Sequence, residues 1–211
     1  MLATGACQPP VSPALLSSST GSMPSHNDIR KRLETLNAIG AALSSERDLD
    51  SLLERILDAA RGFANADGGT LYRVKNDTLV FEVLRNETLG LRMGGKSGKP
   101  IDFPPLPMHR EDGSDNDSLV SVHAALSGKT VNIPDAYAAE GYDFSGTRAF
   151  DSNTGYRSQS FLTVPMKDHG GTVIGVLQLI NAKAVDGTVE PFSDDDQRLV
   201  ESLASQAAIA L

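Results

Sequence analysis

Two neighbouring β-rich runs near the C-terminal end constrain the fold more than any other feature of the sequence. The runs Ser160–Met166 and Thr172–Asn181 consist mainly of branched and apolar residues, and the segment between them contains Asp168-His169-Gly170-Gly171. Turn-forming residues between two such runs are typical of a β-hairpin. The strands of a hairpin pair antiparallel, so the sequence predicts an antiparallel sheet in this part of the chain.

Apolar periodicity divides the rest of the chain, from about Asp28 onward, into helices and further strands. Apolar residues at spacings of three and four predict helices, and short runs rich in β-formers predict strands. The expected helices are Ile29–Leu43, Leu49–Ala64, Leu119–Ser127, Thr147–Thr154 and Asp194–Leu211, and the further strands are Thr70–Val74, Leu79–Leu84 and Thr130–Ile133. Strands grouped between terminal helices predict an α+β fold with an antiparallel sheet.

Turn and capping residues set the expected boundaries of these elements. The sequence Asp67-Gly68-Gly69 is expected to end the second helix, while Ser118 and Ser193 are expected to cap the third and the last helix. The segment Arg85–Asp117 has no periodicity and contains several glycines and prolines. We therefore expect a long irregular loop there, of the kind that often forms a binding loop or lid.

Charge and cysteine content exclude several classes of protein. The formal net charge is −8, and an acidic chain is a poor match for nucleic acid, whose binding requires a basic face. No run of about 18 apolar residues is present, so we expect neither a membrane span nor a membrane partner. Cys7 is the only cysteine, which favours a reducing, cytoplasmic compartment.

Composition separates the N-terminal residues from the domain. Residues 1–27 are rich in Pro, Ser and Gly and predict a disordered leader or a cloning remnant. Residues 28–211 are expected to form one domain, since single domains usually contain about 100–200 residues. The last helix reaches the final residue without a stop signal, as expected of a chain cut from a longer protein.

The sequence contains no recognisable catalytic constellation. The histidines at positions 26, 109, 123 and 169 do not show metal-ligand spacing, and no nucleophile elbow or phosphate-binding glycine loop is present. A haem ligand at His123 is a weaker interpretation than an exposed or hydrogen-bonded histidine. We therefore expect a protein that is not itself an enzyme, with no catalytic residue and no metal.

A group of polar residues lies among the apolar strands. Asp151, Thr154 and Ser158 are spaced by three and four, and Gln178 interrupts an apolar strand. One interpretation is a hydrogen-bonding network around a helix end. The other is a polar rim around an apolar ligand pocket.

Four ordered motifs resemble a known family. They are Asn132-Ile133-Pro134-Asp135-Ala136-Tyr137, Thr154-Gly155-Tyr156-Arg157-Ser158, Phe161-Leu162-Thr163-Val164-Pro165-Met166 and Val173-Ile174-Gly175-Val176-Leu177-Gln178-Leu179-Ile180-Asn181. Together they closely resemble the GAF domains of cyclic-nucleotide phosphodiesterases and of bacterial signalling proteins. The resemblance implies a six-stranded antiparallel sheet, with the terminal helices on one face and short pocket helices on the other.

The resemblance also implies a set of site residues. The ligand-binding positions are Thr70, Leu84, Arg85, Ser121, Asp151, Thr154, Ser158 and Gln178. Of these, Leu84 and Arg85 replace the aromatic residue and the acid that would stack on and read a nucleotide base. Lys183 and Asp196 match a pair that supports the pocket in nucleotide-binding members; the alternative is two unrelated surface charges.

The function that this resemblance implies is regulatory. We expect a sensor domain of a larger signalling protein that binds a cyclic nucleotide, which is the first candidate, or another small molecule. Its terminal helices would form a homodimer and pass ligand occupancy to an output domain. The alternative is a ligand-free dimerisation module whose pocket is filled by its own side chains. An enzyme of the free methionine sulfoxide reductase type would need cysteines within the domain, and none is present there.

Overall fold

The computed structural model describes residues 37–38, 40–41, 45–96 and 98–211. The expected leader therefore lies outside the described residues, as does most of the expected helix Ile29–Leu43. The four described residues within that range, at positions 37, 38, 40 and 41, are helical.

The centre of the fold is an antiparallel sheet, as expected. Its main path has the order β3-β2-β1-β7-β6-β5, and two short strands extend it where β4 pairs with β2 and β8 pairs with β7. The strands are β1 (Ala66–Lys75), β2 (Thr78–Asn86), β3 (Leu91–Gly94), β4 (Leu106–Pro107), β5 (Val131–Ile133), β6 (Phe161–Lys167), β7 (Val173–Lys183) and β8 (Val189–Glu190). The predicted α+β class and the six-stranded antiparallel core are thus confirmed.

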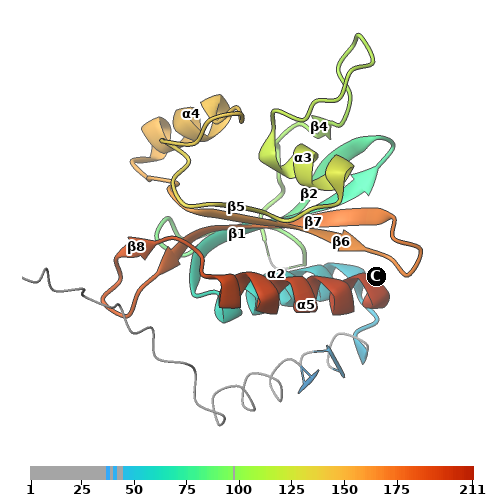
Figure 1. Cartoon of the computed structure of the whole chain (residues 1–211). Coiled ribbons are helices and arrows are strands. Elements are labelled where there is room, and N and C mark those ends of the chain that lie inside the picture. The colour runs from blue at the N-terminus through green and yellow to red at the C-terminus, as the bar shows by residue number, and fades with distance from the viewer. Residues whose placement is uncertain (1–36, 39, 42–44, 97) are drawn as a thin grey trace, which may run out of the picture.

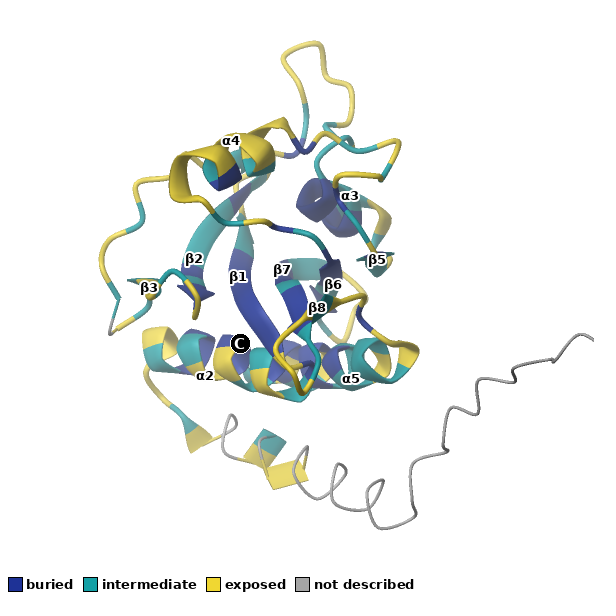
Figure 2. Ribbon diagram, turned by 90° about the vertical axis from the view of Figure 1, so that its left-hand side faces the viewer, coloured by how far each residue is buried: buried dark blue, intermediate teal, exposed yellow. Residues whose placement is uncertain are grey.

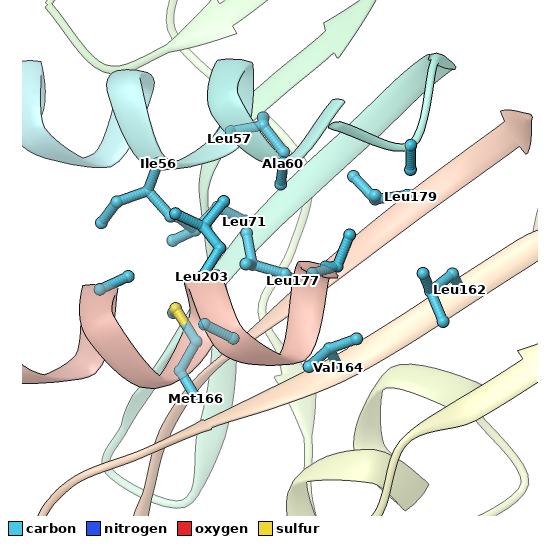
Figure 3. Close-up of a cluster of buried hydrophobic side chains, with 14 of the residues drawn as sticks. Ile56, Leu57, Ala60, Leu71, Leu162, Val164, Met166, Leu177, Leu179 and Leu203 are labelled. Carbon is cyan, nitrogen blue, oxygen red and sulfur yellow. The ribbon is translucent and has the colours of Figure 1, made fainter. Parts of the chain in front are cut away.

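Four helices cover the two faces of the sheet. The helices α2 (Leu49–Phe63) and α5 (Asp194–Ala210) lie side by side on one face, and α3 (Val120–Ser127) and α4 (Ser145–Thr154) lie on the other, as Figure 1 shows. The main apolar core fills the space between the sheet and α2 and α5 (Figure 3). Figure 2 shows the buried residues concentrated in the central strands and on the inward sides of α2 and α5.

Local sequence signals explain the two long helices. The side chain of Asp48 accepts a hydrogen bond from the backbone N–H of Ser51 and caps α2, whose buried residues recur every three or four positions. Ser193 and Asp196 form a reciprocal capping box at the start of α5. Both predicted helices are confirmed, and Ser193 is the predicted N-cap.

The role expected for Asp67-Gly68-Gly69 was wrong. The helix α2 ends at Phe63, the chain turns at Asn65 with a φ of 44°, and these three residues lie inside β1. A Cβ atom added at Gly69 would lie 3.0 Å from a methyl carbon of Leu57. The absence of a side chain therefore allows α2 to approach the sheet closely at this position.

Both predicted hairpins are present. β1 and β2 are joined through Asn76 and Asp77, which both have positive φ angles, of 47° and 62°. Left-handed conformations at both central residues match the twist of the strands, and Asn and Asp tolerate them better than most residues. β6 and β7 pair over almost their whole length, so the turn at Asp168-His169-Gly170-Gly171 is confirmed.

Two expected boundaries before α3 were also wrong. The supposedly irregular segment Arg85–Asp117 begins within β2 and contains β3 and β4, which both pair with β2. Ser118 does not cap α3, because the helix begins one residue later than expected and Leu119 occupies the cap position without a side-chain bond. The carbonyl of Ser118 instead accepts a hydrogen bond from Asp143 N–H. Within the described ranges, none of the helices has the length and apolar content needed to cross a membrane.

Candidate functional site

A cavity of about 380 Å³ lies on the face of the sheet that α3 and α4 cover. Its floor is formed by β1, β2 and β7, and its walls come from the first turns of α3 and α4 and from the loop before β4. It is lined by Gly69, Thr70, Tyr72, Phe81, Leu84, Arg85, Asn86, Phe103, Pro104, Leu106, Leu119, Val120, Ser121, Asp143, Phe144, Gly146, Thr147, Phe150, Tyr156, Ser158, Phe161, Gln178 and Ile180. The volume falls within the range of about 300–1,000 Å³ that is typical of small-molecule sites.

Aromatic side chains form two groups in the lining. The ring of Phe81 lies 4.7 Å from that of Tyr72 and 5.5 Å from that of Phe103, measured between centroids. In a second pair, the rings of Phe144 and Phe161 are 5.4 Å apart. Such walls accept flat apolar ring systems. The sequence reasoning missed these residues, although in β1 and β2 the pleat places Tyr72 and Phe81 opposite each other.

Gln178 is held in a chain of polar side chains on the floor of the cavity. Its Oε1 accepts a hydrogen bond of 3.3 Å from the Tyr72 hydroxyl, and its Nε2 donates one of 3.2 Å to Thr163 Oγ1. Burial raises the pKa of the Tyr72 phenol, although hydrogen bonds from Thr70 and Ser121 act in the opposite direction. A side-chain amide has two N–H donors and two lone pairs, so Gln178 retains one of each for a ligand.

The N-terminus of α3 also borders the cavity. Val120 and Ser121, in its first turn, belong to the lining, and no side chain caps this helix. The first N–H groups of a helix have no partner within the helix, and they favour an anion. The start of α4 differs, because Asp143 Oδ1 accepts a hydrogen bond of 2.8 Å from Ser145 N–H.

Six of the eight predicted ligand-binding residues line the cavity: Thr70, Leu84, Arg85, Ser121, Ser158 and Gln178. The Arg85 side chain, however, is held away from a ligand. Its guanidinium donates to Glu54 Oε1 of α2 at 2.7 Å, on the opposite face of the sheet, and its side chain is only 1% exposed. Arg85 is the single basic residue among those that line the cavity, so no basic side chain faces a ligand there.

Asp151 and Thr154 do not line the cavity. The carboxylate of Asp151 is buried and accepts hydrogen bonds from Ser158 N–H at 2.7 Å, from Ser158 Oγ at 2.8 Å and from the Tyr137 hydroxyl at 2.8 Å. Asp151 thus holds Ser158 in place and does not reach the ligand space. Thr154 is exposed, and its hydroxyl donates to the carbonyl of Phe150.

The predicted Lys183–Asp196 pair is not formed. Lys183 Nζ instead contacts the buried carboxylate of Asp67 on β1. Asp196 already accepts hydrogen bonds from Ser193 N–H and Oγ in the capping box of α5. Asp196 is hydrogen-bonded within the capping box, and Lys183 pairs with Asp67 on the neighbouring strand β1 instead.

Asp67 is a residue that the sequence reasoning missed. Besides Lys183, its carboxylate accepts hydrogen bonds from the hydroxyl of Tyr156 at 2.6 Å and from Thr88 at 2.9 Å. Tyr156 lines the cavity, and its oxygen also accepts a bond from Asn181 Nδ2 at 2.9 Å. The phenol oxygen is therefore occupied by the protein, and Tyr156 offers the ligand space an apolar ring.

The Asp67 network makes stability depend on pH. Burial alone would raise the pKa of the Asp67 carboxyl, but hydrogen bonds from Lys183, Tyr156 and Thr88 outweigh it and lower this pKa below its ordinary value. A lowered pKa in the folded state stabilises the protein above the pKa of the unfolded chain, and this stabilisation is lost as the pH falls through both values. The loss should therefore occur below about pH 4.

We expect Asp67→Asn to lower the free energy of unfolding by about 1–3 kcal/mol at pH 7. The difference from wild type should shrink as the pH falls below about 4, because wild-type Asp67 then begins to be protonated as well. Urea titrations at each pH measure it. The matched control is Asp112→Asn, whose exposed carboxylate accepts hydrogen bonds from Ser114 and should affect stability far less than Asp67→Asn. Equal losses for the two variants at pH 7 would contradict the role of Asp67.

Comparison with known proteins places this site in context. A family model described as the GAF domain matches residues 48–211. The chain is 33% identical over 175 residues to the Dual 3',5'-cyclic-AMP and -GMP phosphodiesterase 11 of Drosophila melanogaster, which covers 80% of this chain and 11% of that protein. A Dual 3',5'-cyclic-AMP and -GMP phosphodiesterase 11A of Takifugu rubripes is 37% identical over 89 residues, or 42% of this chain and 9% of that protein. The chain thus corresponds to about a tenth of the length of these relatives.

Solved structures share the fold. The GAF domain of a phosphoenolpyruvate-protein phosphotransferase from Coxiella burnetii has a TM-score of 0.62 at 16% identity, over 85% of this chain and 91% of that chain. A free methionine-R-sulfoxide reductase from Neisseria meningitidis has a TM-score of 0.59 at 18% identity, over 89% of this chain and 92% of that chain. At such identities the likeness concerns the fold alone. Because the family model spans residues 48–211 and the fold is shared, the chain belongs to the GAF domain family.

Proposed function

We propose that this GAF domain is the regulatory sensor of a longer signalling protein and binds a small molecule in the cavity between the sheet, α3 and α4. The observation that carries the proposal is the cavity of about 380 Å³ with a mainly apolar and aromatic lining and a few directed polar groups. Pockets of this composition are the usual sites of small ligands. In this proposal the domain binds its ligand without transforming it.

The lining favours a flat ring system with one polar or anionic end. The aromatic groups can cover the ring, Gln178 offers one donor and one acceptor to its edge, and the first turn of α3 can accept an anion. Cyclic nucleotide is the first candidate, because it has both parts and because the two relatives above are named as cyclic-nucleotide phosphodiesterases. Leu84 cannot stack on a base, and the Arg85 side chain points to the opposite face of the sheet. A nucleotide base would therefore be recognised by residues other than these two.

Ligand occupancy would reach the rest of the protein through the terminal helices. α5 packs against α2 and β6, and Ile209 in its last turn is 78% exposed. An apolar side chain exposed at this position supports pairing with a second copy of the helix, and hence the homodimer that we propose. The output domain would receive the signal from α5.

The alternative of a ligand-free dimerisation module requires a small closed cavity filled by the domain's own side chains. A volume of about 380 Å³ favours the sensor over this alternative. A reductase of the related fold is disfavoured, since Cys7 lies outside the domain and no other cysteine exists to carry the reaction.

Thermal unfolding in the presence of cyclic GMP, cyclic AMP or small metabolites tests the proposal. A ligand at one hundred times its dissociation constant stabilises the folded state by about 2.7 kcal/mol, which should raise the Tm by about 5–10 °C. Gln178→Ala should reduce this shift, whereas Thr154→Ala, outside the cavity, should leave it unchanged. The absence of any shift at millimolar ligand would contradict the proposal.

A further inference from the structure

Phe103 is a large apolar side chain that lines the cavity and yet remains 42% exposed. Its ring lies against Phe81, with centroids 5.5 Å apart and planes inclined by 60°. A phenyl ring left this far in water retains much of the apolar surface that burial would stabilise. An apolar ligand surface that packs against Phe103 in the cavity would therefore remove this ring from water and stabilise the complex.

The loop that carries Phe103 is anchored on both sides. Before it, Gly94 N–H donates to the carbonyl of Lys99 at 2.7 Å. After it, β4 pairs with β2, and Met108 N–H donates to the carbonyl of Asp77 at 3.0 Å. The next residue, His109, contacts Asp77 through Nδ1 at 2.6 Å and Asp115 through Nε2 at 3.2 Å.

The short segment between these anchors has little backbone freedom. Pro104 and Pro105 follow Phe103 directly, and proline fixes φ while restricting the residue before it. The ring of Phe103 can therefore adjust by side-chain rotation while its backbone position at the cavity is maintained. A preorganised aromatic ring loses little entropy when it packs on a ligand.

On β2, Phe81 and Leu84 both line the floor of the cavity. Leu84 carries no ring and cannot stack on a planar ring system. Tyr72 and Phe81 already pack against each other, and Phe81 packs against Phe103 in turn. Phe103 is thus the exposed end of a row of three rings.

We propose that Phe103 stacks on the ring system of the bound ligand and thereby selects flat aromatic ligands over aliphatic ones of similar volume. This inference rests on the proposed function, since it assigns a specificity residue to the same cavity. The ligand ring extends the row Tyr72–Phe81–Phe103 and buries the exposed face of Phe103.

Binding titrations of four proteins with three probes test this role. The proteins are wild type, Phe103→Ala, Phe103→Leu and Phe103→Trp, and the probes are cyclic GMP, cyclic AMP and anilinonaphthalene sulfonate, an aromatic anion that fluoresces in apolar sites. Phe103→Ala should weaken binding by about five- to thirtyfold, as expected for the loss of one stacked aromatic ring. Phe103→Leu should weaken it nearly as much, because it keeps apolar volume but removes the ring. Phe103→Trp should retain wild-type affinity.

The chain contains no tryptophan, so Phe103→Trp also gives a single fluorescent reporter. Its emission should shift to shorter wavelength, and acrylamide should quench it less, when a probe binds. Val185→Ala is the matched control, since Val185 is fully exposed on the turn between β7 and β8 and does not line the cavity. Circular dichroism confirms that each variant keeps the wild-type fold.

The outcomes separate this inference from the proposed function. If a probe binds and Phe103→Leu binds it as well as wild type does, ring stacking is wrong while the sensor function stands. If anilinonaphthalene sulfonate depends on Phe103 but neither nucleotide binds, the stacking role is supported and cyclic nucleotide is excluded as the ligand. If none of the probes binds wild type saturably, the inference and the proposed function are both overturned.

Discussion

Replacing Asp151 with alanine is expected to lower the free energy of unfolding by about 2–4 kcal/mol and the Tm by about 5–15 °C. The carboxylate is 3% exposed and accepts three hydrogen bonds, from Ser158 N–H, Ser158 Oγ and the Tyr137 hydroxyl. Its removal leaves a buried N–H and a buried hydroxyl unpaired, and such groups pay their full desolvation cost. Urea unfolding followed by circular dichroism measures the change.

Asp186 supplies a matched control for Asp151. Its carboxylate also accepts one backbone N–H and one hydroxyl, both from Thr188, but it lies on an exposed turn. Asp186→Ala should therefore lower stability far less than Asp151→Ala does. If Asp151 contacted the ligand rather than the protein, Asp151→Ala would weaken ligand binding with stability close to that of Asp186→Ala. That result would contradict the assignment made here.

The fold could be predicted from the sequence because several local signals agree. Apolar residues at spacings of three and four predicted the helices, and short runs rich in β-formers predicted the strands. The Asn132–Asn181 motifs identified the order of elements around the sheet. Ser193 marked the start of α5. These signals act over a few residues and need no knowledge of distant contacts.

The site was harder to predict because it depends on which face of an element a side chain occupies. Leu84 and Arg85 are consecutive in β2, and consecutive strand residues point to opposite faces. Both were expected to contact a ligand, yet only Leu84 faces the cavity while Arg85 reaches Glu54. Because side chains alternate between the two faces of a strand, only one of these two residues could be expected to face the cavity.

The spacing of residues in the sequence could not predict side-chain partners that lie far apart along the chain. The carboxylate of Asp196 accepts hydrogen bonds from Ser193, three residues earlier in the chain. The capping-box pattern indicates this local bond, which competes with a pair to Lys183. Nothing in the spacing of Lys183 indicates Asp67, which is 116 residues distant. Their contact arises because β1 and β7 are neighbours in the sheet, and Asn181, with a φ of 57°, interrupts the regular pairing beside them.

Removing Glu54 should also destabilise the domain strongly, because it would leave the Arg85 guanidinium buried without its counter-charge. Besides the bond to Glu54, this guanidinium donates to the carbonyls of Leu84 at 2.8 Å and Met93 at 2.7 Å. Breaking a buried ion pair by deleting one partner costs about 3–5 kcal/mol. The Glu54 side chain is 17% exposed and Asp58 adds a favourable charge, so we expect about 2–4 kcal/mol for Glu54→Ala.

The pair of Arg55 and Glu46, separated by 3.5 Å and with side chains 48% and 24% exposed, is the control for Glu54→Ala. Glu46→Ala should lower stability much less than Glu54→Ala does, because solvent screens the pair. The double variant Glu54→Leu with Arg85→Met removes both charges and keeps apolar volume, and it should recover most of the lost stability. Urea unfolding of all three variants decides the matter: if Glu54→Ala is no less stable than Glu46→Ala, Arg85 does not depend on Glu54. In that case the hydrogen bonds from its guanidinium to the carbonyls of Leu84 and Met93 would be enough to hold the buried charge.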